Sequence, residues 1–133
     1  ALNTYEVTRK GSKVAVLALG DFYDLGEKTV EALSSTLGIE ATLVKPYFAS
    51  GVDQDLLDNL VKDHDVIVTI EDGIIEGGWG QNIASYLGTS PARVLNYGVK
   101  KAFYDRVNIA DLMRESHLEP ELIAADVKQV LGL

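Results

Sequence analysis

Apolar residues along this chain come in short unbroken runs that alternate with stretches of helical periodicity. Val14–Leu19 is an apolar run closed by Gly20, and Val66–Ile70 is a second run rich in β-branched residues. Runs of this kind are typical of strands that are covered on both faces of a sheet. Two shorter runs, Ala41–Val44 and Val94–Gly98, have the same character. Together they predict the core strands of the protein.

Helical spacing of apolar residues fills the intervals between these runs. Asp24 with Glu27 resembles a capping pair at the start of the first helix, and Gly38 supplies its stop. Asp53 is a plausible cap for the second helix, and Pro120 favours the first turn of the last one. The pattern predicts helices over residues 24–37, 54–61 and 79–87, and from residues 108 and 120 onward.

Strands and helices therefore alternate along the chain. The first twelve residues are polar and mixed, which favours a short strand or arm that ends in a turn at Gly11. Parallel strands need helical crossovers, and these cover both faces of the sheet. We expect residues 1–133 to form one three-layer α/β/α domain around a mostly parallel, mixed sheet of about five strands.

Charge and composition narrow the classes of function. The chain has 133 residues, a formal net charge of −8, a sequence pI near 4.6 and no cysteine. An acidic chain lacks the basic footprint that nucleic acids and anionic membranes attract. The sequence shows neither a signal peptide nor an apolar run long enough to span a bilayer. We expect a cytoplasmic protein, since the absence of cysteine suits a reducing compartment.

Candidate chemistry lies where the strands end, because open α/β sheets bind ligands beyond the carboxyl ends of their strands. The carboxylates of Asp21, Glu71 and Asp72 could hold Mg²⁺ together at this edge. The same acids also serve as turn and helix-capping residues, and we favour this interpretation because acids are common at helix starts. Both interpretations stay open at this point.

A glycine-rich segment, Gly77-Gly78-Trp79-Gly80, opens the helix after the third core strand. Such a segment can bring backbone N–H groups to a phosphate, and it can also let a helix pack closely against its neighbour. It matches neither the dinucleotide-binding fingerprint nor the P-loop. His64 and His117 lie in polar surroundings near predicted helix ends, and Ser90 before a proline indicates a turn. We find no catalytic constellation.

Val68-Thr69-Ile70-Glu71-Asp72, followed by Gly77-Gly78-Trp79-Gly80, resembles a V-T-x-E-E … G-G-x-G signature. That signature belongs to the C-terminal domain of the thiamine-diphosphate-dependent transketolase superfamily. The resemblance extends from Tyr5 to the last helix. Within the superfamily, Val94–Gly98, Phe103 and Leu118-Glu119 with Ile123 are most similar to the 1-deoxy-D-xylulose-5-phosphate synthase family. The pattern of that family is broken at Tyr47, Ser50-Gly51, Lys100-Lys101 and Arg106-Val107.

The resemblance implies that this domain is a non-catalytic scaffold of a longer enzyme. The domains that bind thiamine diphosphate and Mg²⁺ would lie upstream, and this domain would pack on them and contribute to a homodimer. The interface or anion-site candidates are Glu71, Asp72, Gly77, Gly78, Trp79 and Gly80, with Trp79 either in the interface or in its own core. Alternatives are a transketolase domain, a 2-oxoacid dehydrogenase E1 domain, a separate subunit of a split enzyme, or a stand-alone module for Mg²⁺ and a phosphorylated ligand.

Overall fold

The structure is a computed structural model, and it describes residues 4–47, 51–99 and 109–133. In these residues one sheet has the strand order β1-β3-β2-β4-β5, in which β1 is antiparallel to β3 and the other neighbours are parallel. The strands are β1 (Tyr5–Arg9), β2 (Lys13–Ala18), β3 (Thr42–Pro46), β4 (His64–Ile74) and β5 (Arg93–Val99). The helices are α1 (Tyr23–Leu37), α2 (Gln54–Leu60), α3 (Trp79–Tyr86), α4 (Ile109–Glu115) and α5 (Pro120–Leu131).

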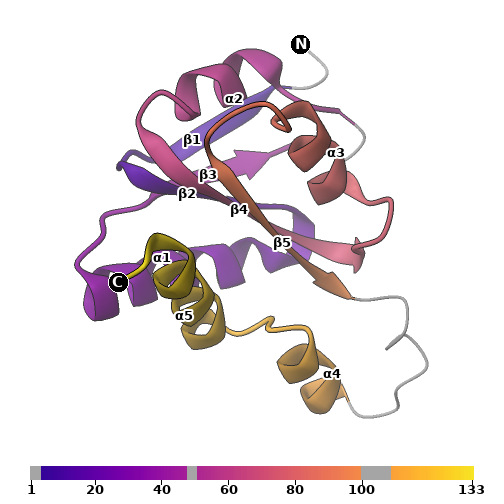
Figure 1. The fold of residues 1–133 in the computed structure, drawn as a ribbon. Helices are drawn as coiled ribbons and strands as arrows, with labels where there is room; N and C mark the ends of the chain where they lie inside the picture. Colours follow the sequence, from indigo (N-terminus) through magenta and orange to yellow (C-terminus); the bar gives the residue numbers. More distant parts are fainter. Residues whose placement is uncertain (1–3, 48–50, 100–108) are drawn as a thin grey trace.

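Helices cover both faces of the sheet, so the expected three-layer architecture is confirmed (Figure 1). Alternate residues of β2 point to opposite faces. Val16 packs in one core with residues of α1 and α5, and Leu17 packs in the other core with residues of α2 and α3. Both residues are fully buried. This two-sided burial is the reason why the strand is apolar without alternation.

The carboxyl ends of β2 and β4 lie side by side in the middle of the sheet. These strands are neighbours, yet the chain leaves β2 through α1 toward β3 and leaves β4 through α3 toward β5. A crevice in an open α/β sheet forms where neighbouring connections diverge in this way. A site is therefore expected at these carboxyl ends, where Leu19 follows β2 and Glu71 lies near the end of β4.

Three of the four predicted helix boundary signals are confirmed. Gly38 ends α1 with a left-handed φ of 68°, Asp53 caps α2, and Pro120 is the first residue of α5. The capping pair at Asp24 and Glu27 is wrong, because α1 begins at Tyr23 and its N-cap residue, Phe22, makes no side-chain cap. A 3₁₀ turn, η1 (Gly20–Phe22), leads directly into α1. Asp24 instead lies in the first turn, where its charge favours the helix dipole.

In the part of the chain that the structure describes, no helix combines the length and the apolar character needed to cross a bilayer.

Asp53 joins the first strand to the second helix. One carboxylate oxygen accepts the N–H of Leu56 at 3.1 Å, and the other accepts the N–H of Tyr5 at 2.9 Å. We predict that Asp53→Ala lowers the free energy of unfolding by about 1–3 kcal/mol, since it removes a helix cap and a second hydrogen bond. Urea unfolding monitored by circular dichroism measures this change. Gln54→Ala at the neighbouring exposed position is the control, with an expected change within about 0.5 kcal/mol, and equal losses in both variants would contradict the assignment.

Candidate functional site

Glu71 occupies the carboxyl end of β4 and is only 5% exposed. One of its carboxylate oxygens accepts the N–H of Trp79 at 3.2 Å, and the other accepts the N–H of Gly80 at 2.8 Å. These are the first N–H groups of α3, whose N-cap residue, Gly78, has no side chain to offer. A carboxylate from a neighbouring strand thus replaces the usual local cap and compensates the positive end of the helix.

Burial raises the pKa of the Glu71 carboxyl above its ordinary value, since removal from water disfavours the charged form. The N–H groups of Gly80 and Trp79 act in the opposite direction, and the negative charge of Asp72 adds to the increase. The acid therefore holds a proton to higher pH in the folded chain than in the unfolded chain. The stability that this linkage contributes is present in full below the ordinary carboxyl pKa and is lost as pH rises through the raised value.

Gly80 is the position at which helix, strand and polar side chains meet most closely. A Cβ atom built there would lie 2.4 Å from Thr69 Oγ1, 2.9 Å from Asn96 Oδ1 and 3.0 Å from Glu71 Oε2. The Thr69 hydroxyl donates to Asn96 Oδ1 at 2.6 Å, and these two residues are register partners on β4 and β5. Glycine is needed here because no side chain fits between the helix and this polar layer.

The exit of β5 is similarly close to the carboxylate. A Cβ atom on Gly98 would lie 3.0 Å from the carbonyl oxygen of Gly73 and 3.2 Å from Glu71 Cγ. Glu71 therefore fills the space between the ends of β4 and β5 and the start of α3. Gly80 of the sequence signature and Gly98 at the end of β5 thus both lie against one buried acid.

This arrangement decides between the two interpretations of the glycine-rich segment. The N–H groups of Trp79 and Gly80 bond Glu71, the N–H of Gly77 bonds Gln81 Oε1 at 2.7 Å, and that of Gly78 bonds the Ile75 carbonyl at 3.1 Å. A phosphate would have to displace these acceptors and approach a buried carboxylate. The geometry favours close packing of the helix over anion binding.

The three carboxylates proposed for Mg²⁺ do not converge. Glu71 is directed at α3, whereas Asp21 and Asp72 are exposed. Asp72 lies against Gly20, where a Cβ atom would be 3.0 Å from Asp72 Oδ2. Among the described residues no group of three or more His, Cys, Asp and Glu side chains could hold a metal ion. The three predicted carboxylates therefore do not form a shared Mg²⁺ site.

Trp79 fills the core of its own chain and is 4% exposed. Its indole N–H donates to the hydroxyl of Tyr5 at 3.0 Å, and the two rings meet edge to face with centroids 6.2 Å apart. The Tyr5 hydroxyl in turn donates to the carbonyl of Gly51. Trp79 therefore fastens α3 to β1, which lies on the other edge of the sheet, and the core interpretation is the one that the structure supports.

His64 follows the end of α2 and its ring contacts polar groups, as predicted, and the structure shows in addition that it is buried at the start of β4. Its Nδ1 lies 2.8 Å from the Leu60 carbonyl, which can only accept, and the proton is therefore assigned to Nδ1. Its Nε2 lies 2.7 Å from Thr42 Oγ1, and that oxygen accepts the N–H of Gly11 at 2.9 Å. The ring is a structural link among β4, β3 and the turn before β2.

Sequence reasoning missed Thr69 and Asn96, which complete the layer beneath Gly80. Each is a polar residue in the middle of an apolar strand, and their equal positions on adjacent parallel strands were a signal that could have found them. Among the departures from the synthase pattern, Tyr47 is exposed and its hydroxyl donates to Glu6 Oε1 at 3.0 Å. The other departures lie wholly or partly outside the described residues, and so does Phe103. They are Ser50-Gly51, Lys100-Lys101 and Arg106-Val107.

We predict that Gly80→Ala destabilises the fold by about 1–3 kcal/mol, because the added methyl group overlaps Thr69 and must displace the helix or the strand. Thermal and urea unfolding measure the loss. Gly73→Ala is the matched control, since its Cβ atom would meet only Glu71 Oε1 at an ordinary 3.8 Å. A Gly80→Ala variant as stable as the Gly73→Ala variant would show that the helix does not pack this closely.

Glu71→Gln tests the buried acid through its pH dependence. The amide keeps one acceptor for the two N–H groups of α3, so we expect a loss of about 1–3 kcal/mol near pH 4, where the native acid is protonated. The loss should shrink as pH rises, because the native protein gives up its linkage contribution through the raised pKa and glutamine does not titrate. Urea unfolding of both proteins from pH 4 to 8 measures the difference. A difference that stays constant or grows with pH would refute the raised pKa.

Comparisons with known proteins agree with this geometry. Residues 3–123 match the family model described as "Transketolase, C-terminal domain". A 1-deoxy-D-xylulose-5-phosphate synthase of Pseudoalteromonas translucida is 39% identical over 129 residues, which cover 96% of this chain and 20% of the relative. A probable chloroplastic synthase of Oryza sativa subsp. japonica is 33% identical over 127 residues, covering 92% of this chain and 18% of the relative. The chain thus spans about a fifth of the length of these relatives.

Solved structures give the same fold. A structure titled "Split gene transketolase, inactive beta4 tetramer", where beta4 refers to subunits, superposes with a TM-score of 0.82 and 25% identity. The match covers 98% of this chain and 42% of that chain. A 2-oxoglutarate:ferredoxin oxidoreductase from Magnetococcus marinus shares the fold alone, with a TM-score of 0.57 and 12% identity over 96% of this chain and 19% of that chain. The family model matches most of the chain and the solved structure shares its fold, so this chain belongs to the transketolase C-terminal domain family.

Proposed function

We propose that this chain is the C-terminal scaffold domain of a thiamine-diphosphate-dependent two-carbon transferase of the 1-deoxy-D-xylulose-5-phosphate synthase type. The observation that carries the proposal is the match to such synthases over nearly the whole chain, at up to 39% identity, in the last fifth of a much longer enzyme. The reaction would join pyruvate and glyceraldehyde 3-phosphate to give 1-deoxy-D-xylulose 5-phosphate and CO₂. It would take place in a reducing compartment such as the cytoplasm.

Hydrogen bonds between the domain's own elements support a scaffold role. Thr69 on β4 bonds Asn96 on β5, and Glu71 on β4 bonds the start of α3. His64 bonds a backbone carbonyl and a threonine hydroxyl. Polar side chains that hold the layers of their own domain together in this way are not available to act on a substrate. Thiamine diphosphate and Mg²⁺ would be bound by other domains of the enzyme, and the failure of Asp21, Glu71 and Asp72 to form a shared metal site supports this proposal.

The exposed members of the sequence signature are the ones that could contact such domains. Glu71, Trp79 and Gly80 are buried within the chain, whereas Asp72 and Gly77 remain exposed at the same edge of the sheet. We infer that the surface around Asp72 and Gly77, at the carboxyl ends of the strands, faces the rest of the enzyme and contributes to its homodimer. The split-gene relative suggests an alternative arrangement in which this domain belongs to a separate subunit.

A domain graft tests the proposal. We predict that a Pseudoalteromonas translucida synthase whose C-terminal domain is replaced by this chain forms a dimer and releases CO₂ from pyruvate when glyceraldehyde 3-phosphate, thiamine diphosphate and Mg²⁺ are present. The isolated chain should release none under the same conditions. The same graft carrying Gly80→Ala is the control, because it should lose stability and activity together.

Two results would contradict the proposal. Turnover of pyruvate by the isolated chain would show that it contains its own catalytic site. A graft that folds and dimerises but is inactive, beside an active graft of the same chain into a transketolase, would assign the domain to the transketolase alternative instead.

A further inference from the structure

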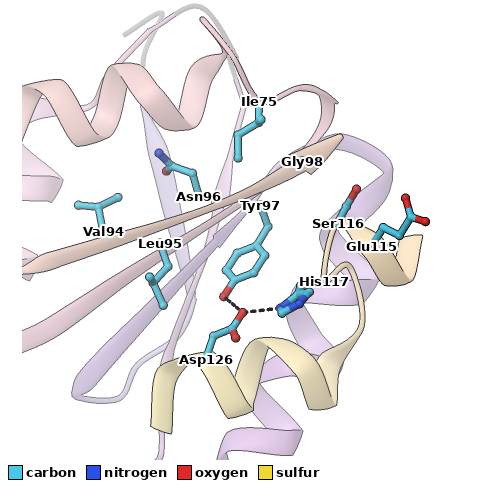
Figure 2. A pocket seen from close by; sticks show the side chains of 10 residues that line it. All are labelled: Ile75, Val94, Leu95, Asn96, Tyr97, Gly98, Glu115, Ser116, His117 and Asp126. Atoms are coloured by element: carbon cyan, nitrogen blue, oxygen red, sulfur yellow. Dashed lines mark hydrogen bonds and ion pairs between the residues drawn. The ribbon is translucent and has the colours of Figure 1, made fainter. Parts of the chain in front are cut away.

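A groove of about 300 Å³ lies along β5, between that strand and the residues around His117 and Asp126 (Figure 2). One wall is β5 itself, and the opposite wall is the connection between α4 and α5 with the adjoining face of α5. The residues that line it are Ile75, Val94, Leu95, Asn96, Tyr97, Gly98, Glu115, Ser116, His117 and Asp126. None of the polar groups on the opposite wall belongs to the Glu71 site described above.

Five consecutive residues of β5, Val94–Gly98, line this groove. Successive side chains of a strand point to opposite faces of the sheet, so a cavity over one face would touch every second residue. Contact with every residue in turn places the groove along the edge of the strand. β5 is the last strand of the sheet, and in the described residues β4 is the strand that pairs with it. The groove therefore runs along backbone N–H and C=O groups that the described sheet leaves unpaired.

The opposite wall presents hydrogen-bonding groups to the same groove. Ser116 is 7% exposed, and its hydroxyl oxygen is buried without a hydrogen-bond partner. His117 Nδ1 lies 2.9 Å from Asp126 Oδ2, which also accepts the hydroxyl of Tyr97 at 2.7 Å (Figure 2). The carboxylate can only accept, so the ring proton is assigned to Nδ1, and Nε2 is the remaining polar atom of the ring.

A groove with an unpaired strand edge on one side and polar groups on the other fits one extended polypeptide segment. Such a segment has hydrogen-bonding groups along both of its edges, and each edge needs a partner when it is buried. Five strand residues extend over roughly 16 Å, which suits a segment better than a compact ligand. A second copy of the sheet does not fit, because its β5 would bring its β4 about 5 Å further out, into the wall formed by Glu115, Ser116 and His117.

Charge indicates the kind of segment. The wall carries the carboxylate of Asp126, and the chain has a formal net charge of −8. Basic side chains are therefore favoured over acidic ones, both on approach and in the groove. The chain's own N-terminal strand, β1, lies at the opposite edge of the sheet, and β5 is separated from it by three strands. β1 therefore cannot be the segment that fills this groove.

We propose that this groove binds an extended, basic segment of a partner polypeptide, which adds to β5 as a further strand and bonds Ser116 and His117 along its outer edge. This inference goes beyond the scaffold role and does not depend on it. It assigns a function to a buried serine hydroxyl that otherwise lacks a partner, since such groups are rare in folded proteins.

The test uses the ¹⁵N-labelled chain and a capped heptapeptide probe of alternating lysine, valine and threonine residues. We predict that titration into the millimolar range shifts the amide resonances of Val94–Gly98, Ser116 and His117 and slows hydrogen exchange along β5. Two matched probes should bind much more weakly. One has proline at alternate positions and so lacks the N–H groups that β5 would accept, and the other has glutamate in place of lysine.

Variants separate the groove from a nonspecific effect. Ser116→Ala and His117→Gly should each weaken binding about threefold to tenfold, because each removes one hydrogen bond to the outer edge of the segment. His117 has a left-handed φ of 57° at the end of α4, so glycine at this position keeps the fold. Tyr47→Phe, at the other end of the sheet order, should leave binding unchanged.

Several outcomes would overturn the proposal. Slow exchange of the outward β5 amides in the chain alone would show that this edge is already paired. Shifts that grow with the concentration of the chain without peptide would assign the edge to self-association. Equal binding of the proline probe, shifts elsewhere on the surface, or no shift at millimolar peptide would each exclude strand addition at β5.

Discussion

The carboxylate of Glu71 caps a helix that it does not belong to, and the arrangement around it follows from that contact. α3 starts with glycines and has no capping side chain of its own, so its first N–H groups need an acceptor from elsewhere. Glu71 supplies both oxygens from the end of β4. To do so the helix must approach the sheet closely, and this approach requires glycine at position 80 and at the exit of β5, position 98. One buried acid thus sets the spacing of β4, α3 and β5.

The energetic cost of this cap explains the polar layer around it. Burial alone would favour a neutral acid, and the raised pKa shows that the N–H groups of α3 offset only part of the desolvation. Thr69 and Asn96 lie beside the carboxylate and bond each other, so no further buried polar atom competes for it. Trp79, the first residue of the capped helix, donates a hydrogen bond to the hydroxyl of Tyr5 on β1, the strand at the opposite edge of the sheet.

The two edge strands of the sheet, β1 and β5, differ in the groups that surround them. β1 is held by Asp53 and Trp79 through Tyr5, so this edge is tied to α2 and α3. β5 is held on one side by β4 and faces a polar groove on the other, with Tyr97, Asp126 and His117 fixing the opposite wall. Both are edge strands, but among the described residues it is β5 whose outer edge faces the buried hydroxyl of Ser116 across a groove.

The sequence by itself determined the elements and the family. Unbroken apolar runs at Val14–Leu19 and Val66–Ile70 required two-sided burial, and helical spacing between them required crossovers, so the α/β/α layers followed from local pattern alone. The tertiary structure decided what the polar residues do. Whether Glu71 binds a cation or caps a helix, and whether His64 is exposed or buried, depends on which residues of distant segments come within 3 Å. Those distances are set by packing between layers, which the order of residues along one chain does not contain.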